Sequence, residues 1–145
     1  MATAVKYFDG ARIAHGRATT GVAATDGSGS STTFTWYAPT GGGAGAPTTD
    51  WMLTKIIFTS TSGTGVGDLA DCLIHIFVDD GTTNRIIRTI DVGNPAAGSV
   101  TVSAYQIEVN FGPEFVFPST VLPEFSVSVT PTAGNLDAVL FAQVA

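Results

Sequence analysis

The residues best suited to catalysis in this sequence are its two histidines, His15 and His75. A nucleophilic mechanism needs a base within hydrogen-bond reach of the nucleophile, and histidine is the usual base. His15 lies in a stretch that has the composition of an N-terminal arm, whereas His75 lies inside an apolar run typical of a β-strand. A hydrogen-bonded structural role is therefore the better interpretation of His75. The sequence predicts no catalytic triad and no enzyme.

Two loops contain residue types that bind phosphate or calcium in other proteins. The glycine-rich run 63–67 lacks the Lys-Ser/Thr ending of a phosphate-binding loop, and no helix is predicted after it. A nearby acidic stretch offers oxygen ligands for Ca²⁺, namely Asp68, Asp71, Asp79, Asp80 and Asn84. Their spacing does not match an EF-hand, and turn formation explains the same side chains. We therefore expect neither a bound metal nor a cofactor.

Carboxylates and aromatic side chains suggest two kinds of carbohydrate site. Glycoside hydrolysis would require paired carboxylates in an aromatic cleft. The candidate acids are Glu108, Glu114 and Glu124. The alternation of polar and apolar residues places Glu108 on a polar face and the nearby phenylalanines in the core, which favours a structural interpretation. The candidate residues for a sugar-binding surface are Trp36, Tyr37 and Trp51, although aromatic residues in strands more often belong to the core.

The composition combines few charges with much glycine. Charged residues make up 12% of the 145 residues, about half the usual share, and there are 17 glycines. A chain of this length usually forms one domain with a real core. Its exterior must then be rich in threonine, serine, glycine and alanine, or be covered by other subunits. We find neither a secretory signal nor an apolar run of about 20 residues, and expect a cytosolic product without a membrane partner.

The few charges are unevenly distributed. The net charge of −6 argues against sequence-independent nucleic-acid binding, which needs lysine and arginine to replace counterions on phosphates. Residues 1–20 contain Lys6, Arg12 and Arg17 against Asp9, which gives 3 − 1 = +2. The remaining residues contain three basic against eleven acidic residues, which gives 3 − 11 = −8. A basic arm on an acidic body predicts an acidic partner surface, such as a neighbouring copy of the chain.

The fold class depends most on residues 71–91, which have the pattern of a β-hairpin. Residues 72–79 are apolar on both alternating faces, residues 80–84 are Asp-Gly-Thr-Thr-Asn, and residues 85–92 are a second, more polar β-rich run. The first strand is expected in the middle of a sheet with material packed on both faces, and the second nearer solvent. Residues expected in the core include Ile74, Ile76, Val109 and Val127.

Further runs with a period of two predict more strands. They are residues 32–37, 50–60, 106–111, 124–130 and 138–144, with shorter pieces near 5–8, 100–102 and 115–117. Within 50–60, strict alternation places Leu53 and Ile57 on one side and Met52, Ile56 and Phe58 on the other. No window has helical spacing over three turns. We predict an all-β, two-layer antiparallel β-sandwich, jelly-roll-like, over residues 32–145, preceded by an extended arm and flexible connector over residues 1–31.

Three segments of this chain resemble structural proteins of tailed-bacteriophage virions: LIHIFVDDGTTNRIIRTIDV, VTVSAYQIEVNF and FSVSVTPTAGNLDAVLFAQVA. The shared pattern is an apolar strand, a "DG" hairpin, a strand with arginine, an F-x-V-x-V strand and a closing apolar strand, over about residues 52–145. The resemblance implies a capsid decoration (cement) protein, a small β-sandwich or jelly-roll homotrimer on the exterior of the mature capsid. It implies the major capsid protein as partner and no catalytic residue or cofactor.

Terminal arms of such proteins reach across subunit borders. By this resemblance, Lys6, Tyr7, Arg12 and Arg17 would dock the arm onto an acidic surface of the shell or of a neighbouring copy. The alternative is a tail or fibre-associated virion module that binds host glycans or a receptor through Trp36, Tyr37 or Trp51. The loop 39–47 has no counterpart in the resemblance, so its role is left open.

Overall fold

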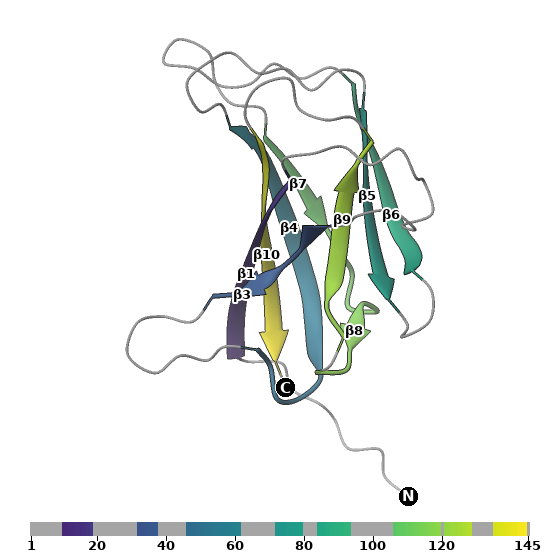
Figure 1. Ribbon diagram of the computed structural model, residues 1–145. Helices are drawn as coiled ribbons and strands as arrows, with labels where there is room; N and C mark the ends of the chain where they lie inside the picture. The colour runs from purple at the N-terminus through teal and green to yellow at the C-terminus, as the bar shows by residue number, and fades with distance from the viewer. Residues whose placement is uncertain are drawn as a thin grey trace, which may run out of the picture.

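The structure, a computed structural model, describes residues 10–18, 32–37, 46–61, 72–79, 84–93, 106–119, 121–128 and 135–144. Within these ranges the chain forms strands and no helix. The strands are β1 (Gly10–Ala18), β2 (Thr32–Thr33), β3 (Thr35–Trp36), β4 (Trp51–Thr61), β5 (Cys72–Asp79), β6 (Asn84–Gly93), β7 (Gln106–Asn110), β8 (Val116–Phe117), β9 (Pro123–Val127) and β10 (Asn135–Val144). They build two antiparallel sheets that pack face to face, which confirms the predicted all-β sandwich (Figure 1).

The strand order is that of a jelly roll. Sheet A has the order β3-β1-β10-β4-β7, with β8 also paired to β4, and sheet B has the order β2-β9-β5-β6. The pairings are nested: β1 pairs with β10, β2 with β9, β4 with β7 and β5 with β6. Folding a long hairpin over on itself produces this nesting, and two sheets connected in this way form a jelly roll.

The core lies between the inner faces of the two sheets. Its fully buried large side chains include Trp51, Leu53, Ile56, Phe58, Ile74, Ile76, Phe125, Val127, Leu136 and Leu140. The rings of Phe58 on β4 and Phe125 on β9 meet edge to face across the layers, 5.4 Å between centroids. Burying each large apolar side chain contributes about 1.5–3 kcal/mol. The four residues predicted for the core are confirmed as buried: Ile74, Ile76, Val109 and Val127.

The predicted hairpin is confirmed as β5 and β6, which pair antiparallel. β5 lies between β9 and β6, and four consecutive residues, 74–77, are buried, as expected for a strand covered on both faces. In contrast, β6 pairs only with β5 among the described strands. Its exposed side chains are Arg85, Ile86, Arg88, Thr89 and Asp91, as expected for a strand near solvent.

The predicted strand 32–37 is divided between the two sheets. β2 pairs with β9 in sheet B, and β3 pairs with β1 in sheet A. Phe34 lies between them, is 3% exposed and packs its ring 5.2 Å from that of Phe125. This short segment therefore connects the two layers along one side of the sandwich.

A β-bulge in β4 corrects the predicted facing of its side chains. Phe141 pairs with Lys55 and Ala142 with Leu53, so Thr54 is an extra residue opposite them. The Thr54 hydroxyl donates to the Phe141 carbonyl at 2.8 Å, and the Thr54 carbonyl accepts from the Phe111 amide at 2.9 Å. The extra residue shifts the alternation. Leu53 therefore faces the core together with Ile56 and Phe58, while Met52 and Ile57 face outward.

The predicted boundary between arm and sandwich also requires a correction. Residues 10–18, assigned to the arm from the sequence, form β1, which pairs with β10 along all nine of its residues. The inward side of β1 includes Ala14 and Ala18, which are buried in the core between the two sheets. Such small side chains give a weak hydrophobic pattern, and the strand is fixed by pairing with a distant segment. Residues 1–9 and 19–31 of the predicted arm lie outside the described residues.

Candidate functional site

The outer face of sheet A has apolar side chains that remain partly or largely exposed in the described part of the chain. Strand pairing places its residues in rows across the sheet. One row runs Ile13, Phe141, Lys55, and the next runs His15, Val139, Ile57. We call the set Ile13, Tyr37, Met52, Ile57, Val116, Val139 and Phe141 the outer apolar patch.

Exposed large hydrophobic side chains gather on this patch. Among the described residues, four are more than a third exposed: Ile13 at 42%, Tyr37 at 55%, Val116 at 41% and Ile86 at 40%. The Tyr37 amide donates to the Ile13 carbonyl, and Val116 pairs with Met52, which places both beside outward-facing residues of sheet A. Only Ile86 lies on sheet B. Three of the four thus lie on a single face, which makes that face a candidate surface for contact with other proteins.

The charged side chains of this face are paired within the chain. The Arg17 guanidinium donates two hydrogen bonds to the Asp137 carboxylate, at 2.6 and 2.8 Å, and this hydrogen bonding raises the pKa of Arg17, as does the charge of Asp137. Lys55 Nζ lies 3.5 Å from the Glu108 carboxylate and 5.0 Å from the centroid of the Phe141 ring. In the described strands the face therefore has two cations and two anions, and no net charge.

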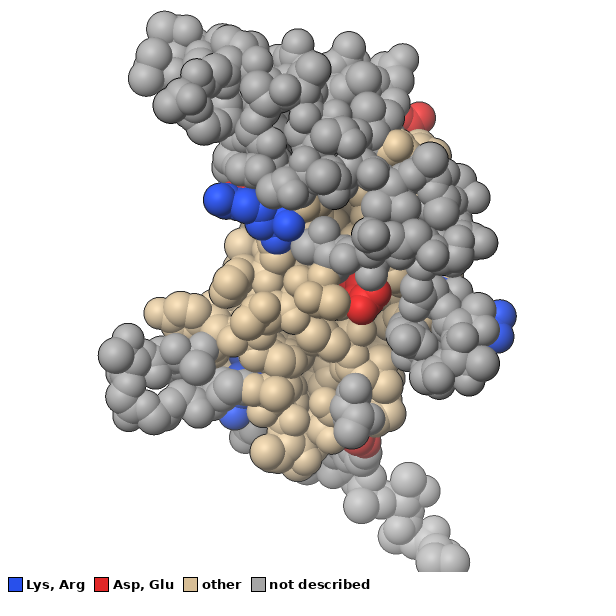
Figure 2. Space-filling model, viewed as in Figure 1, with Lys and Arg blue, Asp and Glu red and all other residues tan. Residues whose placement is uncertain are grey.

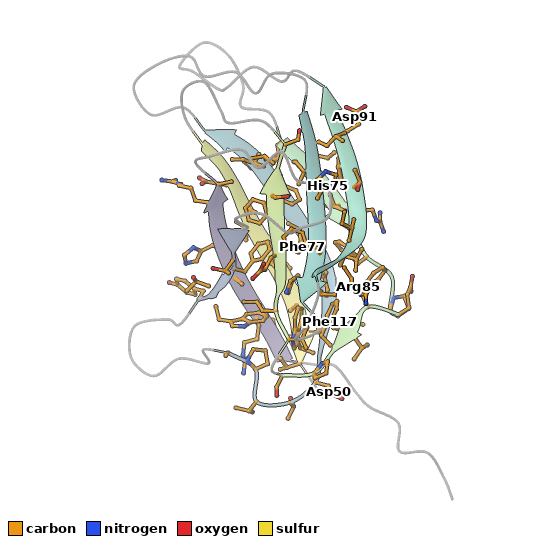
Figure 3. The ribbon with its side chains drawn as sticks, turned by 45° about the vertical axis from the view of Figure 1, so that its right-hand side comes forward. Asp50, His75, Phe77, Arg85, Asp91 and Phe117 are labelled. Atoms are coloured by element: carbon orange, nitrogen blue, oxygen red, sulfur yellow. The ribbon has the colours of Figure 1, made fainter. Side chains whose placement is uncertain are left out.

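The outer face of sheet B differs at its central strand. Figure 3 shows His75 and Phe77 on β5, with His75 nearer the end of β6 that Asp91 marks. Alternation places both side chains opposite the core residues Ile74 and Ile76, and yet His75 is 3% and Phe77 is 0% exposed. This part of sheet B is therefore already buried within one chain.

His75 belongs to a short polar row across sheet B. Its Nδ1 hydrogen-bonds the Thr89 hydroxyl at 3.0 Å, which confirms the predicted hydrogen-bonded histidine. Its other cross-strand neighbour is Ser126, which is 3% exposed. The Nε2 atom of His75 and the Oγ atom of Ser126 are buried without a hydrogen-bond partner. No hydrogen bond joins this serine to the histidine, so the row does not have the geometry of a nucleophile with its base.

The structure describes two of the four predicted docking residues. Lys6 and Tyr7 lie outside the described residues. Arg17 bonds to Asp137 of the same chain, so its charge is already satisfied. Arg12 is partly buried, its Nη1 donates to the Ala11 carbonyl at 2.9 Å, and its Nε is buried without a partner. Neither arginine lies on a free arm, because both belong to β1.

The three aromatic residues considered for sugar binding have different surroundings. Trp51 is 0% exposed, its Nε1 donates to the Val121 carbonyl at 3.1 Å, and its ring lies 5.0 Å from that of Phe117. Trp36 packs edge to face on Trp51 at 5.2 Å and is partly buried. Tyr37 alone of the three is exposed. Trp51 is therefore a core residue and cannot stack on a sugar at the surface.

The acidic side chains considered for metal binding form no metal site in the described part of the chain. The described residues contain no group of three or more histidine, cysteine, aspartate or glutamate side chains placed to hold a metal. Of the candidate calcium ligands, Asp68, Asp71 and Asp80 lie outside the described residues, as do the side chains of Asp79 and Asn84. No helix in the described ranges is long and apolar enough to cross a membrane.

Comparison of the chain with protein-family models and with curated protein sequences gave no match. Figure 2 shows the described surface as predominantly tan, with isolated blue and red side chains, in agreement with the low charge content of the sequence.

The outer apolar patch was not predicted from the sequence. The available signal was that residues 138–144 are apolar on both alternating faces, which indicates burial on two sides.

Proposed function

We propose that this chain is a non-enzymatic structural protein of a bacteriophage virion, a trimeric decoration protein that binds the exterior of the capsid and stabilises it. The observation that carries the proposal is the outer face of sheet A. It gathers three of the four exposed large hydrophobic side chains of the described residues, and its charges are paired within the chain. A surface of this kind acts by contact with other proteins.

The composition supports the same conclusion. With 12% charged residues, the chain has little means of keeping an exposed surface soluble by charge alone. A protein present in many copies on a shell gains from such a surface, because each copy covers part of the next. The resemblance to phage virion proteins over about residues 52–145 supplies the kind of assembly, and the jelly roll is a fold common in viral capsids.

Docking onto the shell is assigned to the segment that precedes β1. Lys6 and Tyr7 lie there, and a basic segment suits an acidic shell surface. Arg17 is not expected to take part, because its guanidinium is bonded to Asp137. The deletion chosen to test this segment therefore ends at residue 9, so that β1, which begins at Gly10, stays whole.

The test is binding to purified expanded heads of the phage that encodes this chain, prepared without it. We expect the full-length protein to occupy the heads and to raise their resistance to heat. Deletion of residues 2–9 should lower the affinity at least tenfold while the circular dichroism spectrum is unchanged. Lys6→Ala should weaken binding, and Arg85→Ala, which removes one positive charge from β6 instead, should not.

The outcomes separate the possibilities. No occupancy by the full-length protein would reject the decoration function, and normal occupancy by the truncated protein would reject the role of residues 2–9. A glycan array tests the alternative of a tail or fibre-associated module. Specific binding to one sugar, lost in Tyr37→Ala, would favour that alternative over the decoration protein.

A further inference from the structure

We infer that the outer apolar patch of sheet A is covered by another copy of this chain. The inference names the surface through which copies meet, which the proposed function leaves open. It rests on that function only for the number of copies in the assembly.

The first reason is the distribution of apolar side chains over the patch. Ile13 and Tyr37 lie at the β1 and β3 side of sheet A, and Val116 lies on β8 beside Met52. Between them, Phe141, Val139 and Ile57 form a continuous partly exposed surface through paired positions of β10 and β4. A patch that reaches both sides of a sheet is suited to an extended protein surface rather than to a small ligand in a pocket.

The second reason is charge. The chain has a net charge of −6, so two copies repel each other on average. The outer face of sheet A is different, because Arg17 and Lys55 balance Asp137 and Glu108. Two acidic chains that meet through this face therefore bring no excess of like charge into the contact itself. The outer face of sheet A has no excess charge of either sign that would attract a strongly charged partner.

The third reason is area. Three strands of at least nine residues, β1, β10 and β4, cover roughly 14 by 31 Å at about 4.8 Å between strands and about 3.4 Å per residue, and the five residues of β7 add about 80 Å², which gives about 520 Å² in all. A stable protein–protein contact buries about 800 Å² on each partner. The face, enlarged at its sides by Tyr37 and Val116, is therefore large enough for most of a contact between copies. Around a threefold axis it would be shared between two neighbours.

The experiment compares two matched isoleucines. Ile13 on sheet A and Ile86 on sheet B are 42% and 40% exposed, so Ile13→Lys and Ile86→Lys make the same chemical change at the same exposure. The purified full chain is studied by sedimentation velocity over a range of concentrations, without heads. We expect the unmodified chain and Ile86→Lys to associate alike, and Ile13→Lys to raise the dissociation constant at least tenfold. Circular dichroism checks that each variant is folded.

A second variant tests the same surface independently, in case Ile13→Lys does not fold. Tyr37 is 55% exposed, so Tyr37→Lys is not expected to disturb the core and should also dissociate the assembly. An unmodified chain that stays monomeric at every concentration would overturn the inference, as would equal dissociation of the Ile13 and Ile86 variants. A monomeric chain that still binds heads would reject this contact between copies but retain the shell-binding part of the proposed function.

Discussion

The outer faces of the two sheets each have a phenylalanine on a central strand, Phe77 on sheet B and Phe141 on sheet A, but these side chains differ in how far they are covered. On sheet B, His75 and Phe77 of β5 are buried within a single chain, at 3% and 0% exposure. On sheet A, the corresponding outward residues of β10 and β4 are only partly buried, and Ile13 beside them is 42% exposed. An apolar outer face therefore does not by itself indicate a partner. The residual exposure of its side chains distinguishes a face completed within the chain from one left open.

The largest expected effect tests the bulge that decides which residues of β4 face outward. Deletion of Thr54 removes the extra residue and leaves Leu53 and Ile56 facing the core. It loses two hydrogen bonds and should cost about 1–3 kcal/mol. Deletion of Ile57 either turns Phe58 outward or, if the bulge is lost, turns Lys55 inward. We expect the Ile57 deletion to give no folded protein. Both deletions are measured by circular dichroism and urea unfolding.

The contrast between the two deletions is the informative result. Comparable loss of folding in both would mean that the bulge does not set the facing of β4. The comparison of outer faces would then lose its basis on sheet A, because Ile57 would not be fixed on the outside.

The second prediction compares one phenylalanine on each outer face. Phe77 is fully buried on sheet B, so Phe77→Ala should lower the free energy of unfolding by about 3–5 kcal/mol. Phe141 on sheet A is partly exposed, and Phe141→Ala should cost about 1 kcal/mol. Urea unfolding of both in the Tyr37→Lys background removes any contribution from contact between copies. Equal costs would contradict the difference in coverage.

The smallest expected effect concerns the polar atoms of sheet B. Ser126 Oγ is buried without a partner, so Ser126→Ala should leave stability unchanged or raise it by up to about 1 kcal/mol. Ser128, two residues further on, is the matched control, because its Oγ accepts a hydrogen bond from the Leu73 amide at 2.8 Å. Ser128→Ala should cost about 1 kcal/mol in the same urea titration. Destabilisation by both would mean that Ser126 has a partner in solution.

The parts of the fold that were predicted are those in which one short segment contains the whole signal. Residues 72–79 are apolar on both faces and are followed by turn residues. The central strand and the hairpin could therefore be predicted from this one segment of the sequence. The strands at 106–110 and 135–144 were recognised in the same way, although the second begins three residues earlier than predicted. The all-β class then follows from the number of strands and the absence of helical spacing, whereas the jelly-roll order is defined by the pairing of distant strands.

The parts that were missed depend on pairing between distant segments. β1 has alanine, glycine and Arg12 on its inward side, and its place in sheet A is set by β10, more than a hundred residues away. The bulge at Thr54 is likewise defined by its partner strand. The outer apolar patch combines residues from β1, β4, β8 and β10 with Tyr37 beside β3. No local pattern brings Ile13 and Val116 onto one face, so the candidate surface required the structure.

The pairing of β1 with β10 also affects how the protein is made. The ion pair between Arg17 and Asp137 joins positions 120 residues apart, and β10 fills the space between β1 and β4. Sheet A is therefore incomplete until β10 has emerged from the ribosome, and before that β1 and β4 each have one edge without its partner strand. Such long-range closure slows folding and exposes the nascent chain to aggregation. Each copy must have β10 in place before it can present the surface through which it would meet another.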